Sequence, residues 1–334
     1  MIEAVAVAVA DETQPGEARR VASGMARILG FDETSVGRVA LVVTEVATNI
    51  VKHGGGGEVL IRPLQEDDEG GIELVGLDKG PGITNLAESR VDGVSRSGSA
   101  GTGLGAIARM ADEHEIYCQP GRGTAVLARI WQRRSSAPQR TRMEVAGVSV
   151  AKPGETTCGD GWAMTRHASG AVIVLADGLG HGPEAAEAAQ EAIRIFRKHT
   201  KEAPAAILRV AHDALRSTRG AAVAIADVDC DSGMVTFSGV GNIAGAVLAA
   251  DRRNMVSQNG TLGHTVRTIS EFTYAWVSDA LVILNSDGLQ SQWSLNAYPG
   301  IAPKDASLIA AILYRDFNRG RDDTTVVVAK TAAA

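Results

Sequence analysis

The stretch Thr44-Glu45-Val46-Ala47-Thr48-Asn49 decides how the first part of this 334-residue chain is interpreted. It lies within residues 34–53, whose apolar positions recur at helical spacing. Glu45 and Asn49 are four residues apart, so a helix presents both on one face. A carboxylate and a carboxamide on one face can hold a hydroxyl or water and a Mg²⁺ ion, respectively. Alone, a Glu-x-x-x-Asn pair occurs by chance on many helices, so it needs further motifs beside it.

Two glycine motifs follow. Asp78-Lys79-Gly80-Pro81-Gly82 ends an apolar run, where an aspartate can accept a hydrogen bond from an exocyclic amine and glycines let the backbone approach a flat ring. Gly101-Thr102-Gly103-Leu104-Gly105 precedes a predicted helix, whose N-terminal N–H groups attract phosphate. The second motif lacks the spacing of a dinucleotide fingerprint and the Gly-Lys-Ser/Thr of a P-loop. Each motif alone is weak, but the three in this order predict a nucleotide site.

The patterns around these motifs predict a mixture of helices and strands. Helical spacing predicts helices over 17–29, 34–53 and 103–111. Apolar runs predict strands over 58–63, 71–78 and 124–131, with residues 66–70 as the hairpin loop between the first two.

On these motifs the first 131 residues resemble the GHKL family of ATP-binding domains. Residues 44–49 fit its N box, 78–83 and 101–105 its two glycine boxes, and 121–124 a trailing Gly-Thr element. The resemblance implies a Bergerat α/β sandwich that binds Mg-ATP, with Asn49 on the metal and Asp78 reading adenine. It carries over the remaining nucleotide-binding residues as well: Gly80, Gly82, Gly101, Thr102, Gly103, Leu104, Gly105 and Thr124.

The short span between the glycine boxes, about 18 residues, favours one branch of that family. No phospho-accepting histidine helix precedes the domain. The domain therefore looks like the serine kinases and anti-sigma factors of bacterial partner switching (the RsbT/RsbW type), and it is closest to the stress-switch kinases. In that branch Glu45 would accept the proton of the attacking serine hydroxyl.

The second part carries acidic residues beside apolar runs and glycine turns. Predicted strands over 171–177, 221–227, 281–287 and 324–330 alternate with helical patterns over 184–199 and 204–217. The acidic residues are Asp160, Asp177, Asp287, Asp322 and Asp323. Asp-Gly after a strand is by itself more often a plain turn, and His181 alone more often a surface histidine. Acids gathered at neighbouring strand ends would repel one another, and an all-oxygen cluster favours Mg²⁺ or Mn²⁺ over zinc.

This part resembles the SpoIIE-like (RsbX-like) branch of the metal-dependent serine/threonine protein phosphatases. The matching pieces are 159–160, 174–182, 241–242, 285–289 and 321–328. The resemblance implies an αββα sandwich with Asp177 as the bridging catalytic ligand and the Gly178 carbonyl on a second metal. Asp287 and Asp322 carry over to the other metal, Asp160 as a weaker ligand, and Asp323 as the alternative to Asp322. The motif Asn259-Gly-Thr-Leu-Gly263 matches a family loop without an assigned role.

The composition of the chain bears on its domain organisation, its partners and its cellular compartment. The polar, basic segment 132–142 predicts a linker between a domain at 1–131 and one at 143–334, an α+β chain. Lys+Arg is 33 and Asp+Glu is 39, so the net charge of −6 argues against nucleic acid or an anionic membrane as partner. Three widely spaced cysteines form no disulfide or zinc pattern, and without an export signal a cytoplasmic protein is expected.

The two resemblances together imply a bifunctional partner-switching regulator in stress or sigma-factor signalling. The first domain would phosphorylate a serine or threonine of a STAS-type antagonist supplied in trans, and the second would remove such a phosphate. The alternative is a non-catalytic, ATP-dependent binding module fused to the phosphatase; an ATP hydrolase of the topoisomerase or chaperone kind is disfavoured because their transducer domain is missing. The helices at 184–199 and 204–217 leave a homodimer open, although packing on the sheet is the favoured use.

Overall fold

The computed structural model describes residues 4–66, 69–83, 103–133 and 141–332. The chain forms two compact α+β units, which confirms the predicted two-domain class. The first unit comprises Met1–Gln139 and Leu295–Ile312, and the second Arg140–Ser294 and Leu313–Ala334. Leu295–Ile312 thus groups with the first unit although it comes after the predicted linker. Most of that linker, residues 134–140, lies outside the described residues.

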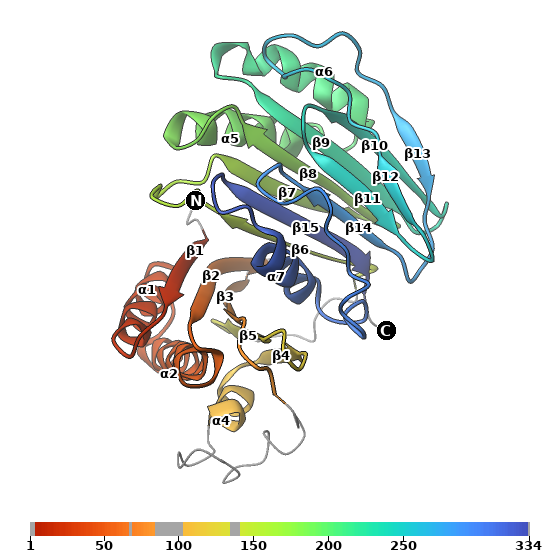
Figure 1. The fold of residues 1–334 in the computed structure, drawn as a ribbon. Coiled ribbons are helices and arrows are strands. Elements are labelled where there is room, and N and C mark those ends of the chain that lie inside the picture. Colours follow the sequence, from red (N-terminus) through yellow and green to blue (C-terminus); the bar gives the residue numbers. More distant parts are fainter. Residues whose placement is uncertain (1–3, 67–68, 84–102, 134–140, 333–334) are drawn as a thin grey trace. The chain divides into compact units, whose positions relative to one another are not determined.

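The first unit has one antiparallel sheet with strand order β1-β2-β3-β5-β4 (Figure 1). Its strands are β1 (Val5–Val9), β2 (Gly57–Glu66), β3 (Glu69–Asp78), β4 (Glu113–Cys118) and β5 (Thr124–Trp131). Its helices are α1 (Gln14–Ile28), α2 (Glu33–Asn49) and α4 (Gly103–Met110), with the π-helical turn η1 (Ile50–Gly54) after α2. Of the predicted loop at 66–70, Glu66 ends β2 and residues 69–70 begin β3, while residues 67–68 lie outside the described residues.

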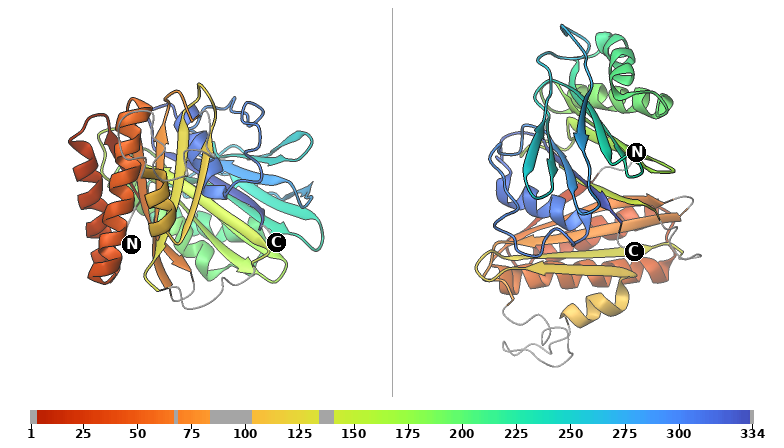
Figure 2. Two further views of the ribbon diagram at one scale, coloured as in Figure 1. Left: turned by 90° about the horizontal axis from the view of Figure 1, so that it is seen from below. Right: turned by 90° about the vertical axis from the view of Figure 1, so that its right-hand side faces the viewer.

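The helices of the first unit cover one face of the sheet (Figure 2). Period-2 alternation turns Ile61, Ile72 and Leu74 toward that face, where they meet Val39 and Val43 of α2. The Asp32 side chain caps α2 by accepting from the N–H of Ser35 at 2.7 Å. By length and composition the helical stretch Glu33–Gly54 could cross a membrane, but it is the core helix of this unit.

The second unit contains two antiparallel five-stranded sheets, in the orders β13-β10-β9-β8-β7 and β12-β11-β14-β15-β6. The strands of the first sheet are β7 (Asp160–His167), β8 (Gly170–Gly178), β9 (Ala221–Asp229), β10 (Met234–Val240) and β13 (Phe272–Ala275). Those of the second are β6 (Met143–Val150), β11 (Ala244–Leu248), β12 (Arg252–Met255), β14 (Leu281–Asn285) and β15 (Thr324–Thr331). The helices are α5 (Pro183–Lys198), α6 (Pro204–Ala214) with the 3₁₀ turn η2 (Leu215–Ser217), and α7 (Ala306–Phe317), which passes from the first unit into the second at Leu313.

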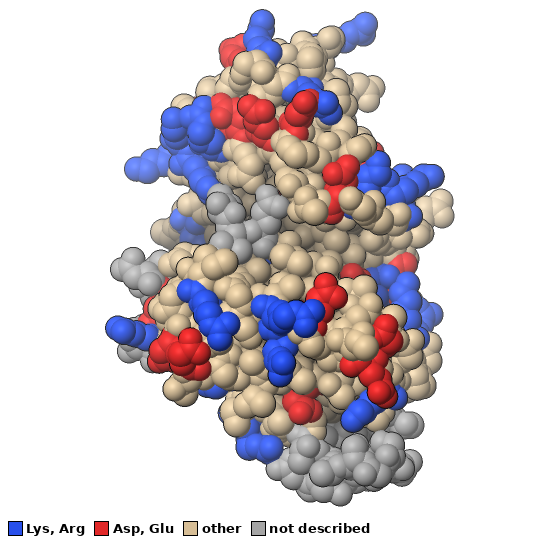
Figure 3. Space-filling view, turned by 90° about the vertical axis from the view of Figure 1, so that its left-hand side faces the viewer, with Lys and Arg blue, Asp and Glu red and all other residues tan. Residues whose placement is uncertain are grey.

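Strand β8 is a continuous apolar run because both of its faces are buried. Ile173 and Leu175 face the core between the two sheets, while Val172 and Val174 face the core under α5 and α6. A strand covered on both faces needs apolar residues at every position. Helix, sheet and sheet therefore give the first three layers of the expected αββα order. On the face shown in Figure 3, acidic and basic side chains are interspersed among the described residues, as a net charge of −6 allows.

Candidate active sites

The first candidate site lies on the polar side of α2. Val42, Val43 and Val46 bury the apolar side of this helix in the core. Glu45 and Asn49 lie half-buried beside that stripe, one turn apart. The predicted helix over 34–53 is therefore correct up to Asn49, after which the chain widens into the π-helical turn η1. Single π-helical turns of this kind are concentrated at functional sites.

Gly103, the first residue of α4, lies directly against the Glu45–Asn49 pair. A Cβ at Gly103 would stand 3.0 Å from Asn49 Oδ1 and 3.3 Å from Glu45 Oε2. Asn49 Nδ2 is buried and has no hydrogen-bond partner among the described residues. An unpaired buried amide costs about 1–3 kcal/mol. The structure thus brings three sequence-predicted residues together around an amide suited to a ligand.

Asp78 ends β3 and is almost fully buried. Its Oδ1 accepts hydrogen bonds from the N–H groups of Gly80 at 2.9 Å and Thr124 at 3.1 Å. These bonds join the first glycine box to the trailing Gly-Thr element. They fix the carboxylate at one end of the strand, where it can present a hydrogen-bond acceptor to a ligand.

Gly54 connects the Asp78 corner to the Asn49 corner. It is the last residue of η1, and a Cβ there would stand 2.4 Å from Asp78 Cβ. Because η1 directly follows Asn49 and ends at Gly54 beside Asp78, one short backbone segment links the surroundings of Asn49 to those of Asp78. Sequence reasoning assigned residues 54–57 only to a loop; the signal available was a glycine run directly after the N box.

The remaining nucleotide-site predictions divide into two groups. Leu104 packs against the hydrophobic core and Gly105 is buried, so they support α4. Gly82 has a positive φ of 72° close to the carbonyl of Gln119. Gly101 and Thr102 lie outside the described residues. An ATP-binding role for all of them stays a prediction.

The second candidate site forms where strands of both sheets end. Asp160 and Asp177 face each other across the β7–β8 pair. Asp287 follows β14, and Asp322 and Asp323 precede the neighbouring strand β15. Like charges directly opposite in a sheet are destabilising. The fold therefore gathers the predicted acidic residues at an electrostatic cost.

A cavity of about 520 Å³ opens at these strand ends. Asp177, Asp287 and Asp322 line it, together with Lys152, Leu179, Gly180, His181, Ala222, Gly241, Asn242, Asn259, Gly260 and Thr261. Asn242 Nδ2 donates to Asp287 Oδ2 at 2.7 Å and so orients that carboxylate. His181 Nδ1 lies 2.7 Å from Glu155 Oε1.

Asp160 and Asp323 are buried behind the cavity wall. Ser286 Oγ donates to Asp160 Oδ2 at 2.6 Å. The N–H of Lys152 donates to Asp323 Oδ1 at 2.8 Å, while Asp323 Oδ2 is buried without a hydrogen-bond partner among the described residues. Gly178, the end of β8, donates its N–H to the Gly159 carbonyl at 3.2 Å. Sequence reasoning missed Ser286 and Lys152; the Asn-Ser-Asp run before Gly288 was the only signal for the serine.

Burial and mutual repulsion change the acidity of these groups. Burial, followed by the charges of Asp160 and Asp287, raises the pKa of Asp177 to about 9. Burial, with the charge of Asp323 and against the Ser286 hydrogen bond, raises the pKa of Asp160 to about 7. Burial also raises the pKa of Asp323. At neutral pH the cluster therefore holds protons that a divalent cation could replace.

The donor chemistry fits Mg²⁺ or Mn²⁺. Asp177, Asp287 and Asp322 offer oxygen donors in one cavity, and Asp323 Oδ2 is a buried oxygen without a described hydrogen-bond partner. Oxygen ligands are those that hard cations prefer. Within the described part of the chain, no three acidic, histidine or cysteine side chains already surround a single point as metal ligands. The ligand set therefore stays a prediction.

Comparisons with known proteins match both parts of the chain. Residues 8–130 match the family model of the histidine kinase-like ATPase domain, and residues 168–332 match that of stage II sporulation protein E (SpoIIE). The serine/threonine-protein kinase RsbT of Bacillus subtilis (strain 168) is 32% identical over 116 residues, which are 35% of this chain and 87% of RsbT. The chain belongs to the RsbT-like kinase family, fused to a SpoIIE-type phosphatase domain.

Solved structures extend this comparison to the fold. A chain from the bacterial stressosome is 29% identical to the RsbT-like fusion with a TM-score of 0.54, over 56% of the fusion and 99% of that chain. A magnesium complex of RsbX has 18% identity and a TM-score of 0.51, over 57% of the fusion and 96% of RsbX. The second likeness concerns the fold alone. The two domain families are typically enzymes, one a kinase and one a PP2C-type phosphatase.

The acidic cluster of the RsbT-like fusion predicts a pH-dependent stability without metal. An acid whose pKa rises on folding contributes fully to stability below its unfolded value near 4, and this contribution is lost progressively as the pH rises to the folded pKa. In EDTA the parent should therefore lose free energy of unfolding as pH rises toward 9, by up to about 1.4 kcal/mol per pH unit for each such group. Asp177→Asn removes one group, so urea unfolding at several pH values should give a stability gain over the parent that is small at pH 5 and larger at pH 8.

The exposed Asp251 supplies the matched control. Asp251→Asn should follow the parent at every pH. A constant difference between Asp177→Asn and the parent from pH 5 to 8 would contradict the repulsion at this site.

The close approach at Gly103 predicts a specific loss of nucleotide affinity. Gly103→Ala should press on Asn49 and Glu45 and weaken Mg-ATP binding by about 10-fold, a loss of about 1.4 kcal/mol. Gly37→Ala lies in α2, the helix that carries Glu45 and Asn49, and its Cβ would meet no neighbouring atom within 4 Å. It is the control and should bind like the parent. Isothermal titration calorimetry measures both. Equal affinities for the two variants would sink this placement of the nucleotide.

Proposed function

We propose that this chain is a fused phosphorylation switch with two opposed activities. Its RsbT-like domain transfers phosphate from ATP to a serine or threonine of a STAS-type partner protein, and its SpoIIE-type αββα domain hydrolyses the resulting phosphoester. One observation carries the proposal: a Glu45–Asn49 pair against Gly103 and a buried carboxylate cluster occur in a single chain. The likeness to a chain from the bacterial stressosome supports a role in that kind of signalling.

In the first domain the chain's own residues position the reactants. Asn49 would hold the Mg²⁺ of Mg-ATP, while Asp78 accepts from the adenine amine and Gly103 leaves room for phosphate. Glu45 lies beside Asn49 and accepts the proton of the attacking hydroxyl. Positioning and charge stabilisation carry most of phosphoryl transfer, so a small set of side chains suffices.

In the second domain the acidic residues would hold two divalent cations. When bound, such ions lower the pKa of a water molecule and stabilise charge on the phosphate. Asp177 would serve both ions, the Gly178 carbonyl would hold one of them, and Asp287 and Asp322 would hold the other. Asn242 keeps Asp287 turned toward the cavity. Asp160 and Asp323 supply negative charge from behind the cavity wall, with Asp160 as a weaker ligand and Asp323 as the alternative to Asp322.

The decisive experiment separates the two activities in one preparation. The full chain is incubated with a purified STAS-domain protein and γ-labelled ATP in Mg²⁺, and Mn²⁺ is then added after ATP is removed. We expect Asp177→Asn to label serine or threonine of the partner and to leave the label in place, and the parent to remove it. Asn49→Ala should not label the partner but should dephosphorylate partner that Asp177→Asn has labelled, so each variant controls for the other.

Three outcomes would contradict the proposal. No labelling by either the parent or Asp177→Asn would leave the first domain as a binding module that uses ATP only for shape, and labelling by Asn49→Ala at the parental rate would contradict the kinase site assigned to Asn49. Dephosphorylation by Asp177→Asn at the parental rate would remove the metal assignment.

A second cavity, next to that of the acidic residues, offers a binding site for the partner's polypeptide. It measures about 630 Å³ and shares Leu179, Asn259, Gly260 and Thr261 with the cavity of the acidic residues. His264, Thr265 and Arg267 complete its wall. The shared wall is the motif whose role the sequence left open. We infer that residues flanking the phosphoserine lie here, with Arg267 facing an acidic group of the partner.

Arg267→Ala should accordingly raise KM for the phosphorylated protein by about 3-fold to 10-fold, the effect of losing about 1 kcal/mol at a solvent-exposed charge pair. Its turnover of p-nitrophenyl phosphate should stay unchanged, because that small ester needs only the metal cavity. Arg253→Ala, another exposed arginine of the same unit, serves as the control. If KM for the phosphoprotein does not move, the partner binds elsewhere.

A further inference from the structure

The segment Leu295–Ile312 comes from the SpoIIE-type region, residues 168–332, yet it belongs to the first compact unit. It contains the start of α7. The surface that receives it is the sheet face opposite the helices. The contacts there are all within the first unit and are unusually rich in charge.

Three charged residues stand in a row across this sheet face. Arg62 of β2 is opposite Glu73 of β3, and Glu73 is opposite Arg129 of β5. Their neighbours Ile61 and Ile72 point into the helix-covered core, so alternation turns the charged row to the other face. A charged row of this kind would ordinarily be solvated.

Glu73 is instead only 1% exposed. Its Oε1 accepts from Arg62 Nε, and its Oε2 accepts from Arg129 Nε at 2.8 Å. Burial by itself raises the pKa of Glu73, but the two guanidinium groups outweigh it and lower that pKa to about 2. A buried charge is tolerated only when its partners are complete.

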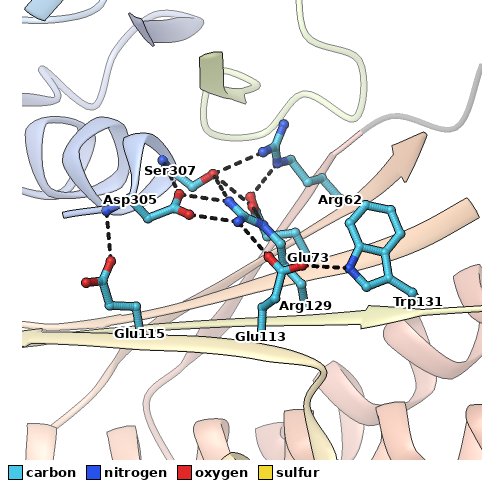
Figure 4. Close-up of polar contacts among 8 residues, drawn as sticks. All are labelled: Arg62, Glu73, Glu113, Glu115, Arg129, Trp131, Asp305 and Ser307. Atoms are coloured by element: carbon cyan, nitrogen blue, oxygen red, sulfur yellow. Dashed lines mark hydrogen bonds and ion pairs between the residues drawn. The ribbon is translucent and has the colours of Figure 1, made fainter. Parts of the chain in front are cut away.

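Residues at the start of α7 supply the remaining partners of Glu73 and Arg129 (Figure 4). Asp305 accepts two parallel hydrogen bonds from Arg129, at 2.7 Å to Oδ2 and 2.8 Å to Oδ1. Ser307 Oγ donates to Glu73 Oε2 at 2.8 Å and is within 3.1 Å of both Arg62 Nη2 and Arg129 Nη2. Asp305 also caps the helix, because its Oδ1 accepts from the N–H of Ser307 at 2.8 Å.

Strand β4 adds contacts that fix the approach of the segment. Glu115 Oε2 accepts from the N–H of Asp305 at 2.8 Å, and its Oε1 accepts from Lys304 Nζ at 2.9 Å. Tyr117 OH donates to the carbonyl of Pro299 at 3.1 Å. Four strands of the sheet therefore contribute to one binding surface.

We propose that this sheet face is an intrachain receptor site for a helix N-terminus of the form Lys-Asp-x-Ser, occupied by Lys304–Ser307 of the same chain. The kinase-like domain is then completed by a segment of the SpoIIE-type region, and the chain has a second joint besides residues 132–142. A buried ion pair is weak evidence for added stability, and in some proteins it instead fixes one register, which is the role proposed for this joint. Helix α7 continues past Ile312 without a break. If Lys304–Ser307 leaves the sheet face, the start of α7 therefore loses the contacts that fix its position.

Hydrogen exchange of the full chain, read by mass spectrometry, tests this joint. Asp305→Asn keeps a good helix cap but removes the carboxylate that pairs with Arg129. Ser307→Ala removes only the hydroxyl that donates to Glu73. We expect amides of residues 304–312 to exchange about 10-fold faster or more in Asp305→Asn, and faster to a smaller extent in Ser307→Ala.

Glu33→Gln is the control, because Glu33 pairs with Arg27 at the exposed start of α2 on the helical side of the sheet. It should leave exchange of residues 304–312 unchanged. Parental exchange rates for this segment in both Asp305→Asn and Ser307→Ala would overturn the receptor site. Should Asp305→Asn unfold the chain, Ser307→Ala decides alone, and neither variant touches the residues proposed to bind ATP or metal.

Discussion

The repulsion between carboxylates that the second unit forces together is the constraint on which the account rests. Antiparallel pairing of β7 with β8 puts Asp160 opposite Asp177, and the β14–β15 pair brings Asp287 and Asp322 to the same cavity. Neither side-chain rotation nor solvent removes the cost, because much of the cluster is buried. Only protons or cations do. Burial and mutual repulsion raise the pKa values of Asp160 and Asp177. Without a cation, the site therefore holds protons in its place.

Other buried polar groups of the chain also need partners, and they differ in whether the protein supplies them. Glu73 is as deeply buried as Asp160, but two arginines and a serine satisfy it, so it is a structural joint. Asn49 has an amide nitrogen without a hydrogen-bond partner in the described part of the chain, which is the mark of a ligand site. Whether partners are complete therefore separates the residues that hold the fold together from those that await a ligand.

The sequence predicted features that depend on local pattern. Strands β8, β9, β14 and β15 are continuous apolar runs. An Asp-Gly step at 177–178 ends β8, and another at 287–288 follows β14. Strand β4 escaped notice because only Ile116 and Tyr117 of its six residues are buried. The joint at Ser307 was invisible, since its partners lie more than 175 residues away and nothing in the local sequence points to them.

Calorimetric titration of the metal-free chain with Mn²⁺ at pH 7.5, repeated in buffers of different ionisation enthalpy, tests the central claim most directly. Asp177, with its pKa raised to about 9, should be protonated before binding and should lose its proton to the buffer. We predict release of about one proton for each chain that binds metal, and a much smaller release in Asp177→Asn, where Asp160 still holds part of a proton at this pH. Mn²⁺ binding with the same heat in every buffer, or no binding at all, would contradict it.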